Sequence, residues 1–194
     1  MSTILFNSHQ SKAYKTEQWR HIFSQWYCSG KPFIGMNAIH DLSQFILKDD
    51  WEKLVLNVQF WLREQWMMYI KALVLAKGEH RDINLDIAKK IIATNDPNII
   101  KQLGRTVKGY DDKIWDECKF KIVVNGNYLE FSQNKEMREI LINTGNRNLA
   151  ECSYKDRIWG VGYNITDAAK TPENKWGLNL LGKAIVEARQ HLIQ

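Results

Sequence analysis

Residues 63–78 read REQWMMYIKALVLAKG, and this stretch decides the interior of the fold. Apolar side chains cover nearly every face between Trp66 and Ala76, and Lys71 is the one charged residue among them. The spacing predicts a buried helix that Gly78 ends. Five residues share one stripe at i, i+3, i+4 and i+7 intervals: Glu64, Met67, Met68, Lys71 and Leu75.

Outward from this helix the pattern predicts more helices than strands. Asp96 and Pro97 are typical of a helix start, and the glycine of Asn125-Gly126-Asn127 is typical of a break. Helices are expected at 84–94, at 97–104 with Gly104 as the end, at 112–124, in two pieces up to 144, and at 176–192. Strands are expected at 17–28 and 149–153, while 33–58 fits a strand pair or a short helix. This order favours an α+β fold, mainly helical with a few short strands, in one domain over 1–194.

The composition is that of a globular protein. The 194 residues are 44% hydrophobic and 25% charged, which excludes a collagen-like repeat or a largely disordered chain. No window approaches the roughly 18 consecutive apolar residues of a membrane span, and the N-terminus lacks a secretory pattern. The three cysteines have no metal-binding spacing, so we expect a cytoplasmic protein. The net charge is +5, but the basic residues are scattered and interleaved with acidic ones, so the charge is weak evidence for nucleic-acid binding.

Common catalytic motifs are missing from the sequence. It contains no Walker loop, no GxGxxG and no HExxH, and its five histidines have no paired spacing. We therefore expect neither a metal nor a cofactor.

Two residues of the buried helix could carry chemistry. Desolvation would lower the pKa of Lys71 and leave a neutral amine able to attack a sugar anomeric carbon, although its stem could equally pack while the ammonium reaches solvent. Glu64 lies two turns earlier on the same stripe, about 10 Å away along the axis, and could face the same pocket. A glutamate in a first helical turn is also commonly stabilised by the helix dipole alone.

A second candidate is SYKDRIWGVGYN at 153–164, where Asp156 precedes Trp159 by three residues. The glycines allow a close backbone approach to a ligand, and the aspartate could orient a ribose hydroxyl or act as a general base. An Asx turn beside a core tryptophan explains the same residues equally well. Trp115 is open to the same two interpretations, core residue or stacking platform.

In their order along the chain, these segments resemble the NADAR (YbiA-like) family over about residues 20–190. The matching segments are Ile22 to Tyr27, Glu64-Gln65, Lys71-Ala72, Asp96-Pro97, Leu103 to Arg105, Trp115, Phe131, Gln133-Asn134, Leu141, Thr144-Gly145, Leu149, Glu151, Asp156, Trp159 to Gly162, Trp176 to Lys183 and Arg189. The chain departs from the family at Gln65, where histidine is frequent, and at Glu130, where lysine is common. The segment 32–62 aligns poorly.

The resemblance implies an α+β fold and cleavage of a bond between ribose C1 and nitrogen. It implies either removal of ADP-ribose from guanine in DNA or RNA, or hydrolysis of early riboflavin-pathway phosphoribosylamino-pyrimidines. A binding module that holds ADP-ribose without turnover is a third hypothesis. The resemblance leaves open whether an ADP-ribosyltransferase toxin, which would attach the modification, is the counterpart of this protein. It predicts no oligomeric state.

Carried over to this chain, the resemblance makes Lys71 a nucleophile that forms an imine, Glu64 a proton shuttle and Asp156 a group that orients a hydroxyl or water. The two tryptophans would form the walls of the site. The expected substrate-binding residues are Trp115, Trp159, Ser24, Gln25, Tyr27, Gly160 and Gly162, the last five as diphosphate contacts.

Overall fold

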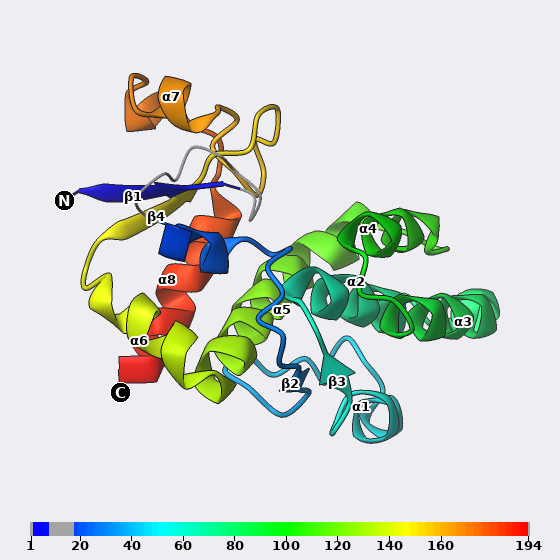
Figure 1. Cartoon of the computed structure of the whole chain (residues 1–194). Helices are drawn as coiled ribbons and strands as arrows, with labels where there is room; N and C mark the ends of the chain where they lie inside the picture. Colours follow the sequence, from blue (N-terminus) through cyan, green and yellow to red (C-terminus); the bar gives the residue numbers. More distant parts are fainter. Residues whose placement is uncertain (1, 8–17, 194) are drawn as a thin grey trace.

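The computed structural model describes residues 2–7 and 18–193, and Figure 1 shows mostly helices with two small sheets. The elements are β1 (Thr3–Phe6), the 3-10 helix η1 (Gln18–Phe23), β2 (Phe33–Ile34), α1 (Lys48–Leu54), β3 (Gln59–Phe60), α2 (Arg63–Val74), η2 (Gly78–His80), α3 (Arg81–Ile92), α4 (Pro97–Thr106), α5 (Asp112–Gln133), α6 (Lys135–Asn143), β4 (Asn148–Glu151), α7 (Ile165–Ala168), η3 (Glu173–Lys175) and α8 (Leu180–Ile193). The predicted α+β class, mainly helical with a few short strands, is confirmed. The domain limits of 1–194 stay a prediction.

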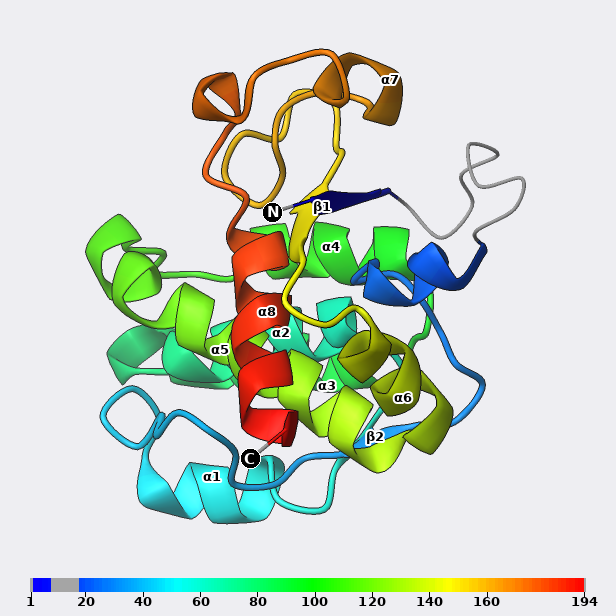
Figure 2. The same ribbon diagram turned by 90° about the vertical axis from the view of Figure 1, so that its left-hand side faces the viewer.

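Helix α2 lies at the centre of the packing. It packs against α3, α4 and α5, and α5 packs along α8. Figure 1 shows α2, α3 and α4 gathered at one end of α5, and Figure 2 shows the β1–β4 pair and α7 at the opposite end of the molecule from α1. Every residue of α2 is buried except Lys71, which is half-buried. The apolar stretch read from the sequence is therefore the core helix.

The predicted break at residues 125–127 is wrong, because α5 runs through it without interruption. A Cβ on Gly126 would lie 2.5 Å from the indole ring of Trp66, so the glycine allows α2 and α5 to approach closely. Asn125 exchanges two hydrogen bonds with the backbone of His40. Packing against neighbours, rather than helix termination, explains these residues.

Gly104 likewise does not end α4, which continues to Thr106. A Cβ at this position would lie 2.1 Å from Sδ of Met68, so the glycine allows α4 to pack closely on α2. Asp96 caps α4 as predicted and accepts from two backbone amides, with Pro97 in the first turn. Gly78 does not end α2, which stops at Val74.

The predicted strand at 17–28 is also wrong in its described part, which forms η1 and a turn. The carbonyl oxygens of Ile22 and Ser24 accept hydrogen bonds from the guanidinium of Arg63, so no neighbouring strand pairs with them. Residue 17 lies outside the described residues. Segment 33–58 contains the short helix, α1, and a single strand, β2, whose partner β3 lies just beyond the segment.

Strand β1 was not predicted, and it pairs in parallel with β4. Phe6 pairs with Glu151 in the last position of the register, so β1 and β4 both end at the same end of this sheet. β2 and β3 form a separate antiparallel pair. The last helix begins at Leu180 rather than at 176, so Leu178 lies outside it and is exposed. None of the helices in the described ranges has the length and apolarity needed to cross a bilayer.

Candidate functional site

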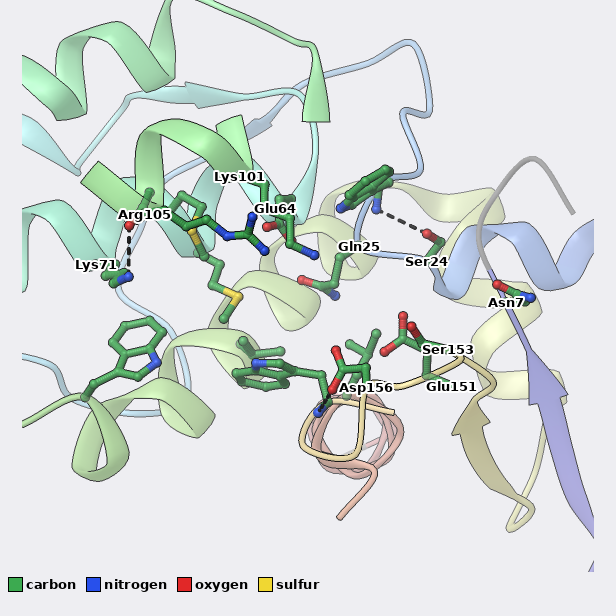
Figure 3. Close-up of a pocket in the computed structure, with 18 residues that line it drawn as sticks. Asn7, Ser24, Gln25, Glu64, Lys71, Lys101, Arg105, Glu151, Ser153 and Asp156 are labelled. Atoms are coloured by element: carbon green, nitrogen blue, oxygen red, sulfur yellow. Dashed lines mark hydrogen bonds between the residues drawn. The ribbon is translucent and has the colours of Figure 1, made fainter. Parts of the chain in front are cut away.

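A cavity of about 360 Å³ opens between α2, α4, the turn after η1 and the loop that follows β4 (Figure 3). It brings together residues that lie far apart in the sequence. Lys71, Glu64 and Asp156, the three predicted catalytic residues, all line it. Of the predicted binding residues, Ser24, Gln25, Trp115 and Trp159 line it as well.

The amine of Lys71 lies inside this cavity rather than in bulk solvent. Its Nζ donates to the carbonyl oxygen of Gly104 at 2.9 Å, in the last turn of α4. The same nitrogen stands 4.8 Å from the ring centre of Tyr110 and 5.5 Å from that of Trp115. Burial lowers the pKa of Lys71, nearby Arg105 lowers it further, and Glu64 opposes both. The amine of Lys71 therefore loses its proton more readily than that of an ordinary surface lysine.

Glu64 is buried in the first turn of α2, and the backbone places it firmly. Its amide donates to the carbonyl oxygen of Gln25 at 3.1 Å, which satisfies one of the free N–H groups of the helix start. Burial raises the pKa of Glu64, and the charge of Lys101 and a hydrogen bond with Trp26 act in the opposite direction. Such a carboxyl group can hold a proton that an exposed glutamate would have lost, which suits a general acid.

Asp156 forms the Asx turn that the sequence left as an alternative, and it also lines the cavity. Its Oδ1 accepts from the amides of Ile158 at 3.0 Å and Trp159 at 2.9 Å. This turn fixes the position of the carboxylate. The Asx turn is therefore confirmed, while a role of the carboxylate toward a ligand stays a prediction.

Glu151 is a cavity residue that the sequence did not single out for chemistry. It ends β4, and its amide donates to Oδ1 of Asn179, whose Nδ2 donates to the carbonyl oxygen of Leu149. Burial raises the pKa of Glu151 to about 8, helped by the negative charges of Asp156 and Glu64. Its signals in the sequence were its place in the predicted strand 149–153 and its place among the residues that resemble the NADAR family.

Lys101 and Arg105 form a cationic rim that the sequence also left unassigned. They lie one turn apart on α4, are both exposed, and face the cavity. Lys101 stacks on Trp26, with 5.6 Å between Nζ and the ring centre. Figure 3 shows this rim and Glu64 on one side of the cavity, with Glu151, Ser153 and Asp156 on the other.

Three predicted binding residues do not line the cavity: Tyr27, Gly160 and Gly162. Tyr27 packs against the hydrophobic core. A Cβ on Gly160 would lie 2.8 Å from the carbonyl oxygen of Glu151, so this glycine permits close packing of the loop. Gly162 has a φ of +82° and forms an isolated bridge with Tyr154. The glycines thus shape the loop that carries Asp156.

A buried ion pair joins the first turn of α2 to α5. Arg63 and Glu130 are almost inaccessible to solvent, and Nε of Arg63 lies 2.7 Å from Oε2 of Glu130. The same guanidinium donates to Oδ1 of Asn127 at 2.8 Å and to the carbonyl oxygen of Ser24 at 2.7 Å. The departure from the family at position 130 is therefore matched by a cationic partner in this chain.

Gln65, the other departure, has a structural role. Its Oε1 accepts from the amide of Trp61 and its Nε2 donates to the carbonyl oxygen of Thr94, which joins the start of α2 to the end of α3. Across residues 2–7 and 18–193, no group of three or more histidine, cysteine, aspartate or glutamate side chains is placed to hold a metal.

Comparisons with known proteins identify the family of this chain. The family model described as the NADAR domain matches residues 11–193. The chain is 36% identical to "N-glycosidase R617" of Acanthamoeba polyphaga mimivirus, over 92% of this chain and 91% of that protein. It is 32% identical to "Protein irg-1" of Caenorhabditis elegans, over 88% of this chain and 75% of that one. "N-glycosidase Npun_R5314" of Nostoc punctiforme is 31% identical but matches only 53% of this chain. The NMR structure of the E. coli protein YbiA has the same fold, with a TM-score of 0.62 and 18% identity over 99% of this chain and 85% of that chain.

Proposed function

Because this chain belongs to the NADAR family, we propose that it is an N-glycosidase that releases ADP-ribose from modified guanine in nucleic acid. The coarser part, cleavage of an N-glycosidic bond, is supported by two relatives that carry the name N-glycosidase. The observation that carries the proposal is the cavity itself. It places a half-buried amine and carboxyl groups from three separate segments around one space: Lys71, Glu64, Glu151 and Asp156.

The first step uses Lys71 as nucleophile. Its neutral amine attacks C1 of the ribose, a C1–N bond to the lysine forms, and the bond from C1 to the guanine nitrogen breaks. Glu64 gives its proton to the departing nitrogen. Glu64 then takes a proton from the lysine nitrogen and passes it to the ring oxygen as the ring opens to a protonated imine.

Water completes the reaction at the same carbon. Asp156 removes a proton from the water that adds to C1 and returns it to the lysine nitrogen. The C1–N bond to Lys71 breaks, the sugar aldehyde forms, and the hydroxyl proton goes back to Glu64. The free amine, a protonated Glu64 and an ionised Asp156 are restored, so protons and charges balance.

The walls and the rim suit the rest of the substrate. Trp115 and Trp159 offer flat faces to an aromatic base or sugar. Lys101 and Arg105 are exposed cations at the opening, where the phosphates of ADP-ribose would meet them. Ser24, which also lines the cavity, stays a proposed diphosphate contact.

The test follows the released product by chromatography: ADP-ribose from the nucleic acids, or the free base from the pyrimidine substrate. The purified chain is incubated with single-stranded DNA and RNA carrying ADP-ribosylated guanine and, separately, with a phosphoribosylamino-pyrimidine. Release of ADP-ribose from either nucleic acid, lost in Lys71→Ala, supports the proposal. Release from the pyrimidine alone favours the riboflavin-pathway activity. Binding of ADP-ribose with no cleavage of any substrate would leave only the binding module.

A further inference from the structure

The ring of Tyr110 is a contact of Lys71 that the proposed reaction does not use. Tyr110 is 49% exposed, and Nζ of Lys71 lies over its ring, 4.8 Å from the ring centre. The same nitrogen lies 5.5 Å from the ring centre of the buried Trp115 and donates to the carbonyl oxygen of Gly104. An ammonium group is attracted by the negative face of an aromatic ring, whereas a neutral amine gains little from it. The surroundings of this nitrogen therefore favour its charged form.

The backbone on both sides of Tyr110 is fixed, although the side chain is half-exposed. Before it, the buried side chain of Asn84 accepts from the amide of Lys108 at 2.9 Å and donates to the carbonyl oxygen of Lys108 at 3.0 Å. After it, the side chain of Asp111 accepts from two backbone amides and caps α5. These anchors place the ring beside Lys71 of α2 and do not leave it to a loose loop.

The charged groups around this contact come from three helices: Glu64 of α2, Arg105 of α4, and Asp112 and Asp116 of α5. The buried residues of α3, which also packs on α2, are uncharged. Burial lowers the pKa of Lys71 most, Arg105 lowers it further, and Glu64 raises it. Partial burial raises the pKa of Tyr110 to about 12, and a hydrogen bond with Asp112 adds to this. The phenol therefore stays un-ionised while Lys71, whose pKa is lowered, titrates.

We propose that Tyr110 is a positioning residue for Lys71, whose ring holds the resting ammonium over its face and thereby sets the pH at which the nucleophile becomes available. This rests on the proposed function, in which Lys71 must be neutral to attack. The amine gives up the attraction of the ring when it loses its proton, so the ring makes that loss harder. It opposes burial and Arg105, which make the loss easier. Without substrate, the ring thus favours a form of the amine that does not react with other carbonyl compounds.

The test follows the titration of Lys71 itself. The lysine amines of the chain are converted to dimethylamines with isotope-labelled formaldehyde and a borohydride reagent, and NMR follows their methyl signals as pH changes. A dimethylated lysine keeps its positive charge and still binds aromatic faces. The signal of Lys71 is the one that is absent from Lys71→Met. Tyr110→Leu removes the ring, Tyr110→Phe keeps it, and Tyr154→Leu is a matched control that removes another exposed ring, 5.4 Å from Nζ of Lys155.

We expect the midpoint of the Lys71 titration to fall by about 0.5–1 pH unit in Tyr110→Leu, to stay close to the wild-type value in Tyr110→Phe, and to be unchanged in Tyr154→Leu. An unchanged midpoint in Tyr110→Leu overturns the proposal. Equal falls in Tyr110→Leu and Tyr110→Phe assign the effect to the hydroxyl group and overturn it as well. A ring face shifts the signals of methyl groups above it upfield, so a wild-type Lys71 signal without this shift overturns the proposal even if no variant folds.

The NMR titration needs no substrate, so its result is independent of the proposed function. That function is tested separately by the rate of ADP-ribose release against pH, whose rising limb should move to lower pH by the same amount in Tyr110→Leu. A limb that stays in place while the NMR midpoint falls counts against Lys71 as the nucleophile, and the hold of the ring on the amine stands.

Discussion

Replacing Lys71 by methionine tests the nucleophile with little damage to the fold. Methionine keeps an unbranched apolar stem for the buried part of α2, and the hydrogen bond from the amine to the carbonyl oxygen of Gly104 is lost. That loss costs about 1 kcal/mol of unfolding free energy, offset in part because a half-buried charge is no longer desolvated. Turnover should fall by at least about 10³-fold, since a missing nucleophile cannot be replaced by binding alone.

The assay is reduction of the intermediate with borohydride during turnover, followed by mass spectrometry of the intact chain and its peptides. The wild-type chain should carry one ADP-ribosyl adduct on the peptide that contains Lys71. Among the described residues, Lys101 is the other lysine that lines the cavity; Lys101→Met should retain the adduct at saturating substrate, which separates catalysis from chance reaction with a nearby amine. Full turnover by Lys71→Met, or an adduct only on other lysines, would refute the reasoning.

Four further outcomes are expected. Glu64→Gln should lower kcat by about 10²- to 10⁴-fold with little change in KM, measured by steady-state kinetics, and unchanged kcat would remove the acid from the mechanism. Asp156→Asn keeps the oxygen that accepts from two backbone amides, so it should lose turnover but keep its melting temperature, whereas Asp156→Ala should lose both. Because the pKa of Glu151 is raised from 4.5 to about 8, the folded state binds more protons than the unfolded state between these values, and unfolding free energy should fall as pH rises through that window. Urea titrations at several pH values should show a weaker fall in Glu151→Gln. Arg63→Met should cost about 3–5 kcal/mol in the same titrations because Glu130 is left buried without its cation, and a loss below 1 kcal/mol would contradict the pairing.

The sequence predicted the elements whose signals are local. The apolar run around Lys71 and the cap at Asp96 depend on neighbouring residues, and both appear in the structure. Gly104 and Gly126 were misread as helix ends because the reason for each glycine is a side chain on α2, distant in sequence. The strand at 17–28 failed for a similar reason, since its carbonyl groups bond to Arg63.

The candidate site was predictable where a single residue stands out from its surroundings. Lys71 did so through its apolar neighbours, and Asp156 through its glycine-rich loop. Glu151 did not, because an acid at the end of a strand is ordinary until the fold places two other carboxyl groups near it. Lys101 and Arg105 were not singled out either, because basic residues are scattered along the sequence and only the fold brings these two to the cavity.

The parallel pairing of β1 with β4 also bears on when this enzyme can first work. Thr3 pairs with Asn148 and Phe6 with Glu151, so β1 cannot pair until β4, which follows it much later in the sequence, has been synthesised. Closing a loop of that length is slow, and such contacts form late. A nascent chain on the ribosome would therefore hold Lys71 and Glu64 without the wall that carries Glu151 and Asp156. Activity should begin only after that wall has emerged and docked.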